Sequence, residues 1–338
     1  MNKYSLIIVL GFLISCSPEI IGNFDSETDI HASSQEGISS NDKYGVKELF
    51  CRVYQGENDE IERRNQSIAV ANNRLFVFGD NNYVFKDGNH MTDNVRIYDL
   101  NTFSEIATAY TGVENTHHNN AQFLNVYYSE DDVYPLLLLS RGDYADIGSS
   151  YEEFYVMRIV ESDGVYTFQR IKTLTCSIEQ VKYNGSWVYS PSGYLFLYTY
   201  TNGTWRLTED NNLCLIAFPI TKEQLKSSDI LQYENCDIEF THNLPYAIMQ
   251  GASCVDGVIY MALQGLGNIN GKVNDIGYNL LVGVNERTGY IDSVMKMDKQ
   301  NIEPEGIAIY DKALYVSYHD GLASEGSVCM LIEKYFLL

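Results

Sequence analysis

A pattern of polar motif, strand, turn and apolar strand occurs five times along the 338 residues of this chain. The motifs are QSIA at 66–69, HNNAQF at 118–123, WVYS at 187–190, QGAS at 250–253 and EGIA at 305–308. A further pair of strand-like runs follows each of the longer copies, and the motif starts lie 52, 69, 63 and 55 residues apart. Four strands in a repeat of this length are typical of a β-propeller blade.

The sequence therefore predicts an all-β fold, a single β-propeller of five four-stranded blades over residues 44–338. Runs such as RLFVFG at 74–79 and YLFLYTY at 194–200 are rich in the Tyr, Val, Ile and Phe residues that favour strands. Only one short helix is expected, from Lys222 to Lys226. Six or seven blades remain an alternative, in which the long second and third copies would hide an extra blade.

The last copy is one strand short. After ALYVSY at 313–318 only one more strand, Val328 to Leu338, fits before the last residue. The run ELFCRVY at 48–54 precedes the first copy and has strand character, so it can supply the missing outer strand. Such pairing would join the first and last blades and remove an exposed sheet edge.

The first residues have the features of an export signal. Lys3 precedes an apolar run from Leu6 to Leu13, which is far shorter than the roughly 20 residues of a membrane-spanning helix. The run ends in Leu-Ile-Ser-Cys at 13–16, which resembles the bacterial lipobox. The resemblance implies that residues 1–15 are removed and that Cys16 is lipidated and anchors the protein to a membrane. An ordinary signal peptide with an incidental cysteine is the alternative.

Residues 16–43 are expected to form a flexible acidic tether. The stretch after Cys16 is rich in Ser, Asn, Glu and Asp, and it cannot bury enough apolar surface to offset the entropy of ordering. Its acidic residues resemble the export tags of surface lipoproteins in Bacteroides-like bacteria. The expected location is therefore the outer membrane, with the cell-surface and periplasmic faces both open.

The charge of the chain limits its partners. The formal net charge is -22 at pH 7. A strongly acidic protein repels phosphate backbones, so nucleic acid is not expected as a partner. We expect a monomer that contacts the membrane through its lipid.

Polar residues at the starts of the innermost strands are the candidate site residues, because these strands line the centre of a propeller. They are Gln66, His118, Asn120, Gln250, Glu303 and Glu305. We expect them to surround one channel mouth although they are far apart in sequence.

His118 and Asn120 allow two interpretations. Residues two apart on a strand face the same side, so the pair could offer a base or metal ligand beside an amide. The other interpretation is structural, with both side chains hydrogen-bonded to neighbouring blades so that they lock the channel.

The segment Glu303-Pro304-Glu305-Gly306 resembles the metal-binding segment of gluconolactonase- and regucalcin-type propellers. The resemblance implies a divalent cation such as calcium at Glu305, and oxygen ligands suit that ion. The Asn and Asp ligands that this family takes from other blades are not identifiable here. A carboxylate bonded to amides of the inner strands is the other interpretation.

Together, the H-x-N-x-x-F, E-P-E-G and Q-G segments resemble a group of secreted propeller lipoproteins of Bacteroides-like bacteria. The first blade departs from it, with Gln66-Ser67 in place of Gln-Gly. The resemblance implies a fold and a compartment but no activity.

Three functions stay open at this point. The chain lacks G-x-S-x-G, H-E-x-x-H and paired-cysteine zinc patterns, which favours a non-catalytic surface protein that binds a glycan or peptide. The alternatives are a metal-assisted hydrolase or lyase acting on a sugar or lactone, with His118 as base, and a scaffold for envelope protein assembly.

Overall fold

The computed structural model describes the chain in segments that all lie within one unit, residues 32–338. The segments are 47–55, 65–79, 94–113, 118–140, 152–177, 187–200, 213–242, 247–265, 279–297, 303–320 and 327–336. The expected signal peptide at 1–15, the lipidated Cys16 and the tether at 16–43 lie outside them and stay predictions. Within these segments no helix has the length and apolar character of a membrane span.

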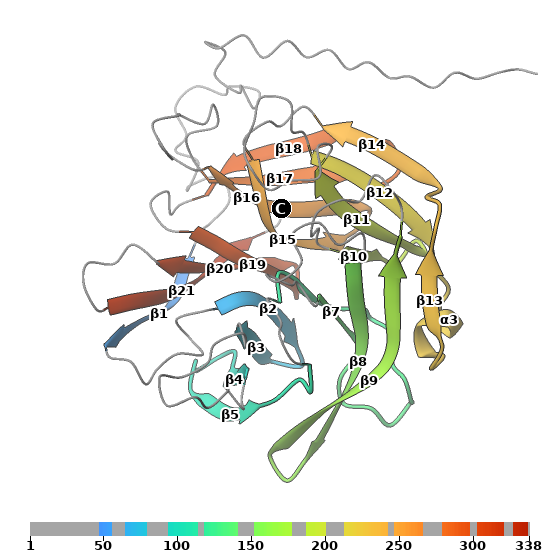
Figure 1. Ribbon diagram of the computed structural model, residues 1–338. Helices are drawn as coiled ribbons and strands as arrows, with labels where there is room; N and C mark the ends of the chain where they lie inside the picture. Colours follow the sequence, from blue (N-terminus) through green and yellow to red (C-terminus); the bar gives the residue numbers. More distant parts are fainter. Residues whose placement is uncertain are drawn as a thin grey trace, which may run out of the picture. The chain divides into compact units, whose positions relative to one another are not determined.

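The strands form five sheets, and each sheet is one blade (Figure 1). Blade 1 contains β2 (Asn65–Ala71), β3 (Arg74–Gly79), β4 (Val95–Asp99) and β5 (Glu105–Ala109). Blade 2 contains β6 (Ala121–Phe123), β7 (Leu137–Ser140), β8 (Glu152–Ser162), β9 (Val165–Cys176) and β13 (Ile230–Tyr233). Blade 3 contains β10 (Trp187–Ser190), β11 (Tyr194–Tyr200), β12 (Leu213–Pro219) and β14 (Ile238–His242). Blade 4 contains β15 (Ala247–Val255), β16 (Val258–Gly265), β17 (Leu280–Asn285) and β18 (Ile291–Lys296). Blade 5 contains β19 (Glu303–Tyr310), β20 (Ala313–Asp320), β21 (Ser327–Phe336) and β1 (Lys47–Gln55).

The prediction of a five-bladed β-propeller is confirmed. In every blade the first strand carries or directly follows the polar motif, and the later strands add outward in chain order, except that β1 forms the outer strand of blade 5. Figure 1 shows β2, β10, β15 and β19 facing one another around the centre. In the described segments, the long second and third repeats hold longer strands and a short helix instead of a further blade.

The closure of the ring also follows the prediction. The N-terminal strand β1 pairs antiparallel with the C-terminal strand β21, with Cys51 opposite Leu331. In Figure 1 the blue and red strands lie side by side for this reason. Because β1 completes blade 5, the last blade has four strands, as the first blade does. The pairing of β1 with β21 also holds the two ends of the domain together.

The connection between β12 and β14 explains the length of the third repeat. It forms α3 (Lys222–Lys226), where the helix was expected, and β13, which pairs in parallel with β9 of blade 2. Thr221 Oγ1 accepts a hydrogen bond from the Gln224 backbone at 3.1 Å, and Gln224 Oε1 accepts one from the Thr221 backbone at 2.8 Å. The buried Lys172 ammonium donates to the Asp229 carbonyl at 2.9 Å and so fastens β13 to blade 2.

The hydrophobic core is divided into layers between neighbouring blades. Strand residues alternate between the two faces of a sheet, so each blade can pack against both neighbours. Between blades 2 and 3 the fully buried Trp187 packs on Phe154 and Phe218, with ring centroids 4.9 and 5.4 Å away. Similar layers join blades 1 and 2, blades 1 and 5, and blades 4 and 5. The position of each inner strand therefore depends on packing on both sides of its blade.

Tight turns fix which end of each inner strand carries its polar motif. β2 turns into β3 through Asn72 and Asn73, with φ of 47° and 57°, and β19 turns into β20 through Asp311 and Lys312, with φ of 48° and 58°. Two successive residues with positive φ are the mark of a type I′ hairpin, which matches the twist of the strands. The turns occupy one end of these strands, and the polar motifs occupy the other.

Candidate ligand-binding site at the inner-strand bulges

Three of the predicted site residues occupy equivalent β-bulges. The pairing register of the first strand skips one residue in three blades: Gln66 in β2, Gln250 in β15 and Glu305 in β19. A bulge leaves its residue out of the ladder and re-aims its side chain, and bulges are common beside functional sites. The three residues belong to blades 1, 4 and 5, which are consecutive around the ring.

The inner strands approach one another closely at these bulges. A Cβ on Gly251 would lie 2.8 Å from the backbone nitrogen of Ile307 and 2.9 Å from the Cα of Gly306. A Cβ on Gly306 would in turn lie 2.6 Å from the nitrogen of Ile68 and 2.8 Å from the Cα of Ser67. Glycine is thus required at positions 251 and 306 because backbones of neighbouring blades are in contact there, and not because of an unusual φ. This contact brings the bulges of three blades together.

A half-buried cluster of two amides and one carboxylate joins blades 4 and 5. Gln250 Nε2 donates to Gln264 Oε1 at 2.9 Å and to Glu303 Oε1 at 2.6 Å. Burial raises the pKa of Glu303, and hydrogen bonds from Gln264 and Gln250 oppose that rise. We call Gln250, Gln264, Glu303 and Glu305 the bulge cluster.

Gln264 was missed by the sequence analysis. It lies near the end of β16, the second strand of blade 4, and not on a first strand. The sequence signal that could have identified it is the Gln-Gly pair at 264–265, which repeats the pair at 250–251. Such a repeat within one hairpin brings two amides to the same end of neighbouring strands.

Glu305 is the most unusual member of the bulge cluster. Only 4% of it is exposed, and no described residue hydrogen-bonds its carboxyl group. Burial raises the pKa of Glu305 well above its ordinary 4.5, and the nearby charge of Glu303 raises it further. The two carboxyls are therefore close enough to repel each other, and the protonated form of Glu305 is favoured.

Gln66 completes the row of bulge residues. It is 9% exposed, and its amide makes no hydrogen bond with any described residue. Its blade touches blade 5 through the contact of Gly306 with Ser67. Gln66 therefore lies on the blade beside Glu305 and offers both a donor and an acceptor.

Asn120 ties three blades together. Its Nδ2 donates to the Trp187 carbonyl of blade 3 at 2.7 Å, and its Oδ1 accepts from the Ala252 backbone of blade 4 at 3.2 Å. Its own backbone N–H donates to Ser140 Oγ at 2.8 Å within blade 2. The side chain is 2% exposed and both of its polar atoms are engaged. These contacts favour the interpretation in which Asn120 locks the ring.

His118 lies between blades 1 and 2, fully buried and away from the bulge cluster. Its Nδ1 is 2.7 Å from the Ser140 carbonyl, and its Nε2 is 3.2 Å from Asn94 Nδ2. A carbonyl can only accept, so Nδ1 carries the proton and Nε2 accepts from the amide. The Phe78 ring packs edge-on at 6.1 Å. With both nitrogens engaged, His118 favours the structural interpretation over that of a general base.

The bulge cluster does not match the ligand set expected for calcium. Calcium takes six to eight oxygen ligands. Here the Glu303 carboxylate is met by amide N–H groups of Gln250 and Gln264, which a cation would have to displace. Among the described residues no three His, Cys, Asp or Glu side chains gather as a metal site. These residues therefore do not fit a calcium ion bound at Glu305.

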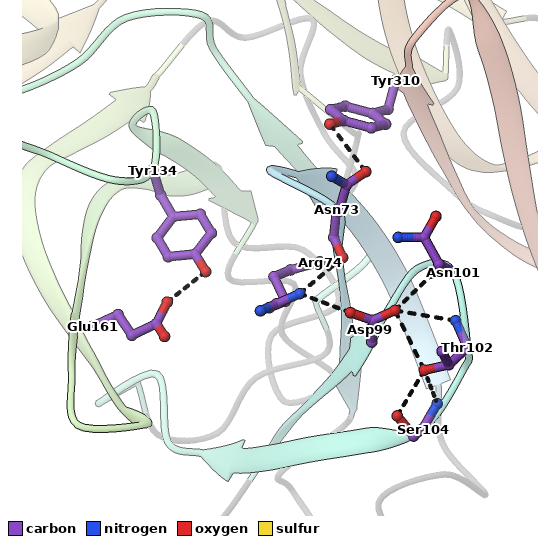
Figure 2. Close-up of polar contacts among 9 residues, drawn as sticks. All are labelled: Asn73, Arg74, Asp99, Asn101, Thr102, Ser104, Tyr134, Glu161 and Tyr310. Atoms are coloured by element: carbon purple, nitrogen blue, oxygen red, sulfur yellow. Dashed lines mark hydrogen bonds and ion pairs between the residues drawn. The ribbon is translucent and has the colours of Figure 1, made fainter.

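The polar residues at the other end of β2 form a contrasting network, shown in Figure 2. Arg74 pairs with Asp99 at 3.0 Å, and Asp99 accepts from the backbones of Asn101 and Thr102 at 3.0 and 3.1 Å. These backbone hydrogen bonds, more than Arg74, lower the pKa of Asp99. Such a carboxylate holds a turn and has its partners within the fold, unlike Glu305.

Glu305→Gln is expected to stabilise the protein at neutral pH. Above pH 4.5 Glu305 ionises in the unfolded chain but keeps its proton in the fold, so stability falls as pH rises toward the raised pKa. The variant should remove this fall, which is at most about 1.4 kcal/mol per pH unit. Urea unfolding between pH 5 and 8 measures the difference. Asp99→Asn is the control with opposite sign, because the lowered pKa of Asp99 stabilises the fold at neutral pH. Equal pH slopes for wild type and Glu305→Gln would contradict the raised pKa.

No protein-family model matches the chain, and no curated protein matches it. Among solved structures, it is similar to the β-propeller domain of Cps50 (Swd1) from Myceliophteria thermophila. The sequence identity is 10%, the TM-score is 0.35, and the match covers 83% of this chain and 99% of that domain. The assignment to the propeller fold rests on the five sheets and their strand order.

Proposed function

We propose that this protein is an exported, lipid-anchored binding protein that captures a glycan or peptide at the bulge cluster. The β-propeller fold supports a binding or scaffold role in general, and the finer assignment comes from the site. The observation that carries it is the meeting of amide and carboxyl groups from blades 4 and 5 at half-buried positions.

Incomplete hydrogen bonding marks this end of the inner strands, where buried side-chain polar atoms of Asn65 and Ser67 on β2 also have no hydrogen-bond partner among the described residues. Asn120 and His118 have their side-chain polar atoms engaged by other residues of the fold, whereas Gln66 and Glu305 have no hydrogen-bond partner among the described residues. Buried polar groups without partners cost free energy. A ligand that offers hydrogen bonds to them recovers that cost, so these positions favour binding.

The location is proposed from the N-terminal sequence. Lipid on Cys16 and a tether to residue 43 would hold the propeller near the outer membrane, where it can meet extracellular or periplasmic ligands. Cys16→Ser should abolish incorporation of labelled fatty acid and release the protein from the membrane fraction. Membrane attachment that persists in this variant would contradict the anchor.

The hydrolase or lyase alternative has weaker support. A glycosidase places two carboxyls on either side of the bond that it cleaves. Glu303 and Glu305 instead come from one strand, two residues apart. His118 is buried with both ring nitrogens engaged, so it is poorly placed to act as the base.

Gln250→Ala should weaken ligand binding about tenfold, which corresponds to about 1.4 kcal/mol, because the amide bridges both partners of the cluster. Glycan and peptide arrays probed with the wild-type chain identify the ligand, and titration then compares variants. The matched control is Gln232→Ala, an exposed glutamine on the outermost strand β13 that bonds Ser177 at 3.1 Å, far from the inner strands. If both variants bind as the wild type does, the bulge cluster is not the site.

A further inference from the structure

We propose that the ligand group entering the bulge cluster is an organic cation, the ammonium or guanidinium group of an amino sugar or of a lysine or arginine side chain. This inference rests on the proposed function and names the ligand chemistry of the same site. It begins from the two carboxyls of β19, Glu303 and Glu305, and from what does and does not face them.

The first argument is the lack of a cationic partner. In the described segments the carboxylates that form ion pairs lie elsewhere: Asp99 with Arg74, Glu105 with Arg96, Asp132 with Arg158 and Asp229 with Lys172. The bulge cluster contains two acids and two neutral amides. Two carboxyls that repel each other, with no ion pair to a described lysine or arginine, form a site that favours a positive charge from outside.

The second argument is the burial of Glu305. Only 4% of this residue is exposed to solvent, yet no described residue hydrogen-bonds its carboxyl group. A buried carboxyl without partners is costly, and the cost falls when donors arrive. An ammonium brings three N–H donors and a guanidinium five, all carrying positive charge. A neutral hydroxyl can satisfy the hydrogen bond but supplies no positive charge to stabilise the ionised form of Glu305 beside Glu303.

The third argument is the backbone that holds the two acids. The bulge at Glu305 interrupts the β19–β20 ladder, while the contacts of Gly306 with blade 1 and Gly251 with blade 5 prevent the inner strands from shifting. A site held by packed backbone loses little entropy when it orders a ligand. The acids are therefore kept near each other before any ligand arrives.

Binding of a cation should be linked to proton release. Burial favours the protonated form of Glu305, and the cation favours the ionised form, so binding displaces a proton and affinity rises with pH. The described groups that hydrogen-bond Glu303 are the neutral amides of Gln250 and Gln264 in blade 4. His319 lies opposite Glu303 in the β19–β20 ladder. The variant His319→Gln therefore separates proton release by Glu305 from any contribution of this histidine.

The test uses the purified full chain and two pairs of probes matched in size. One pair is a glucosamine oligomer and its N-acetylated counterpart, and the other is a lysine peptide and its Nε-acetylated counterpart. Calorimetric titration in two buffers of different ionisation enthalpy gives both the affinity and the number of protons released. The first pair tests an amino sugar as the source of the cation, and the second tests a peptide.

We expect one cationic probe to bind at least about tenfold more tightly than its acetylated counterpart and to release about one proton. Glu305→Gln should abolish both the preference and the proton release, and its melting curve shows whether it folds. Glu161→Gln, on the opposite end of the blades, is the matched control and should change neither.

Two results overturn the inference, and they differ in what they say about the site. If acetylated probes bind as tightly as cationic ones and Gln250→Ala still weakens both, the proposed binding site stands and the cationic ligand is wrong. If no probe of either kind shows binding that depends on Gln250 or Glu305, both proposals fail.

Discussion

Gly306→Ala is expected to destabilise the fold by about 3 kcal/mol or more, the upper range for overpacking a core. The added Cβ would lie 2.6 Å from the nitrogen of Ile68 and 2.8 Å from the Cα of Ser67. Both neighbours are backbone atoms, so no side chain can rotate away. Blade 5 would have to move from blade 1, which opens the interface packed by Ile68 and Ala308. Chemical denaturation of the two proteins measures the change.

Gly164→Ala is the matched control for this substitution. Gly164 lies in the turn between β8 and β9 with φ of 76°, and a Cβ there would have no atom within 4 Å. Its cost is therefore conformational, roughly 1–2 kcal/mol. If Gly306→Ala costs no more than Gly164→Ala, the inner strands are not in the close contact described above.

Asn120→Ala is expected to cost about 2–6 kcal/mol, because it leaves two buried backbone groups without partners at about 1–3 kcal/mol each. They are the Trp187 carbonyl and the Ala252 N–H, which belong to different blades. The side chain is almost fully buried, so water cannot readily replace it. The loss should appear as a lower midpoint in urea.

Two further variants interpret the Asn120 result. Asn120→Asp keeps the shape but cannot donate to the Trp187 carbonyl, so it should also destabilise the fold. Asn101→Ala changes an exposed asparagine in a turn, and we expect a change within about 0.5 kcal/mol. A small effect of Asn120→Ala, comparable to that of Asn101→Ala, would show that the three blades do not depend on this amide.

The architecture could be predicted because the same sequence pattern recurs in every blade. A polar motif followed by two strand-like runs marks the start of every blade, and the short last repeat pointed to β1 as its missing strand. The short helix α3 lies at Lys222–Lys226, where the sequence predicted it. The parallel pairing of β13 with β9 was not foreseen, since it depends on a contact between blades that local patterns do not encode.

The candidate site was predictable only in part. The polar motifs at the starts of the inner strands identified Gln250, Glu303 and Glu305, but the bulges at Gln250 and Glu305 are shifts in pairing register, which require both strands to be known. His118 and Asn120 have the same polar character in sequence as Gln250. What separates Asn120 is that the backbones of two neighbouring blades engage both of its polar atoms, through the Trp187 carbonyl and the Ala252 N–H. Those contacts arise only when the ring closes.

The central claim is that the bulge cluster holds two carboxyls without a cationic partner in the described fold. Carbon-13 NMR titration of the side-chain carboxyls of the glutamates tests it most directly, with Glu303→Gln and Glu305→Gln to assign the two signals. We predict that both titrate above the ordinary glutamate pKa of 4.5, Glu305 more so than Glu303. We also predict that Glu303→Gln brings the pKa of Glu305 down, because the repulsion is removed. Titration of both carboxyls near 4.5 would contradict the account.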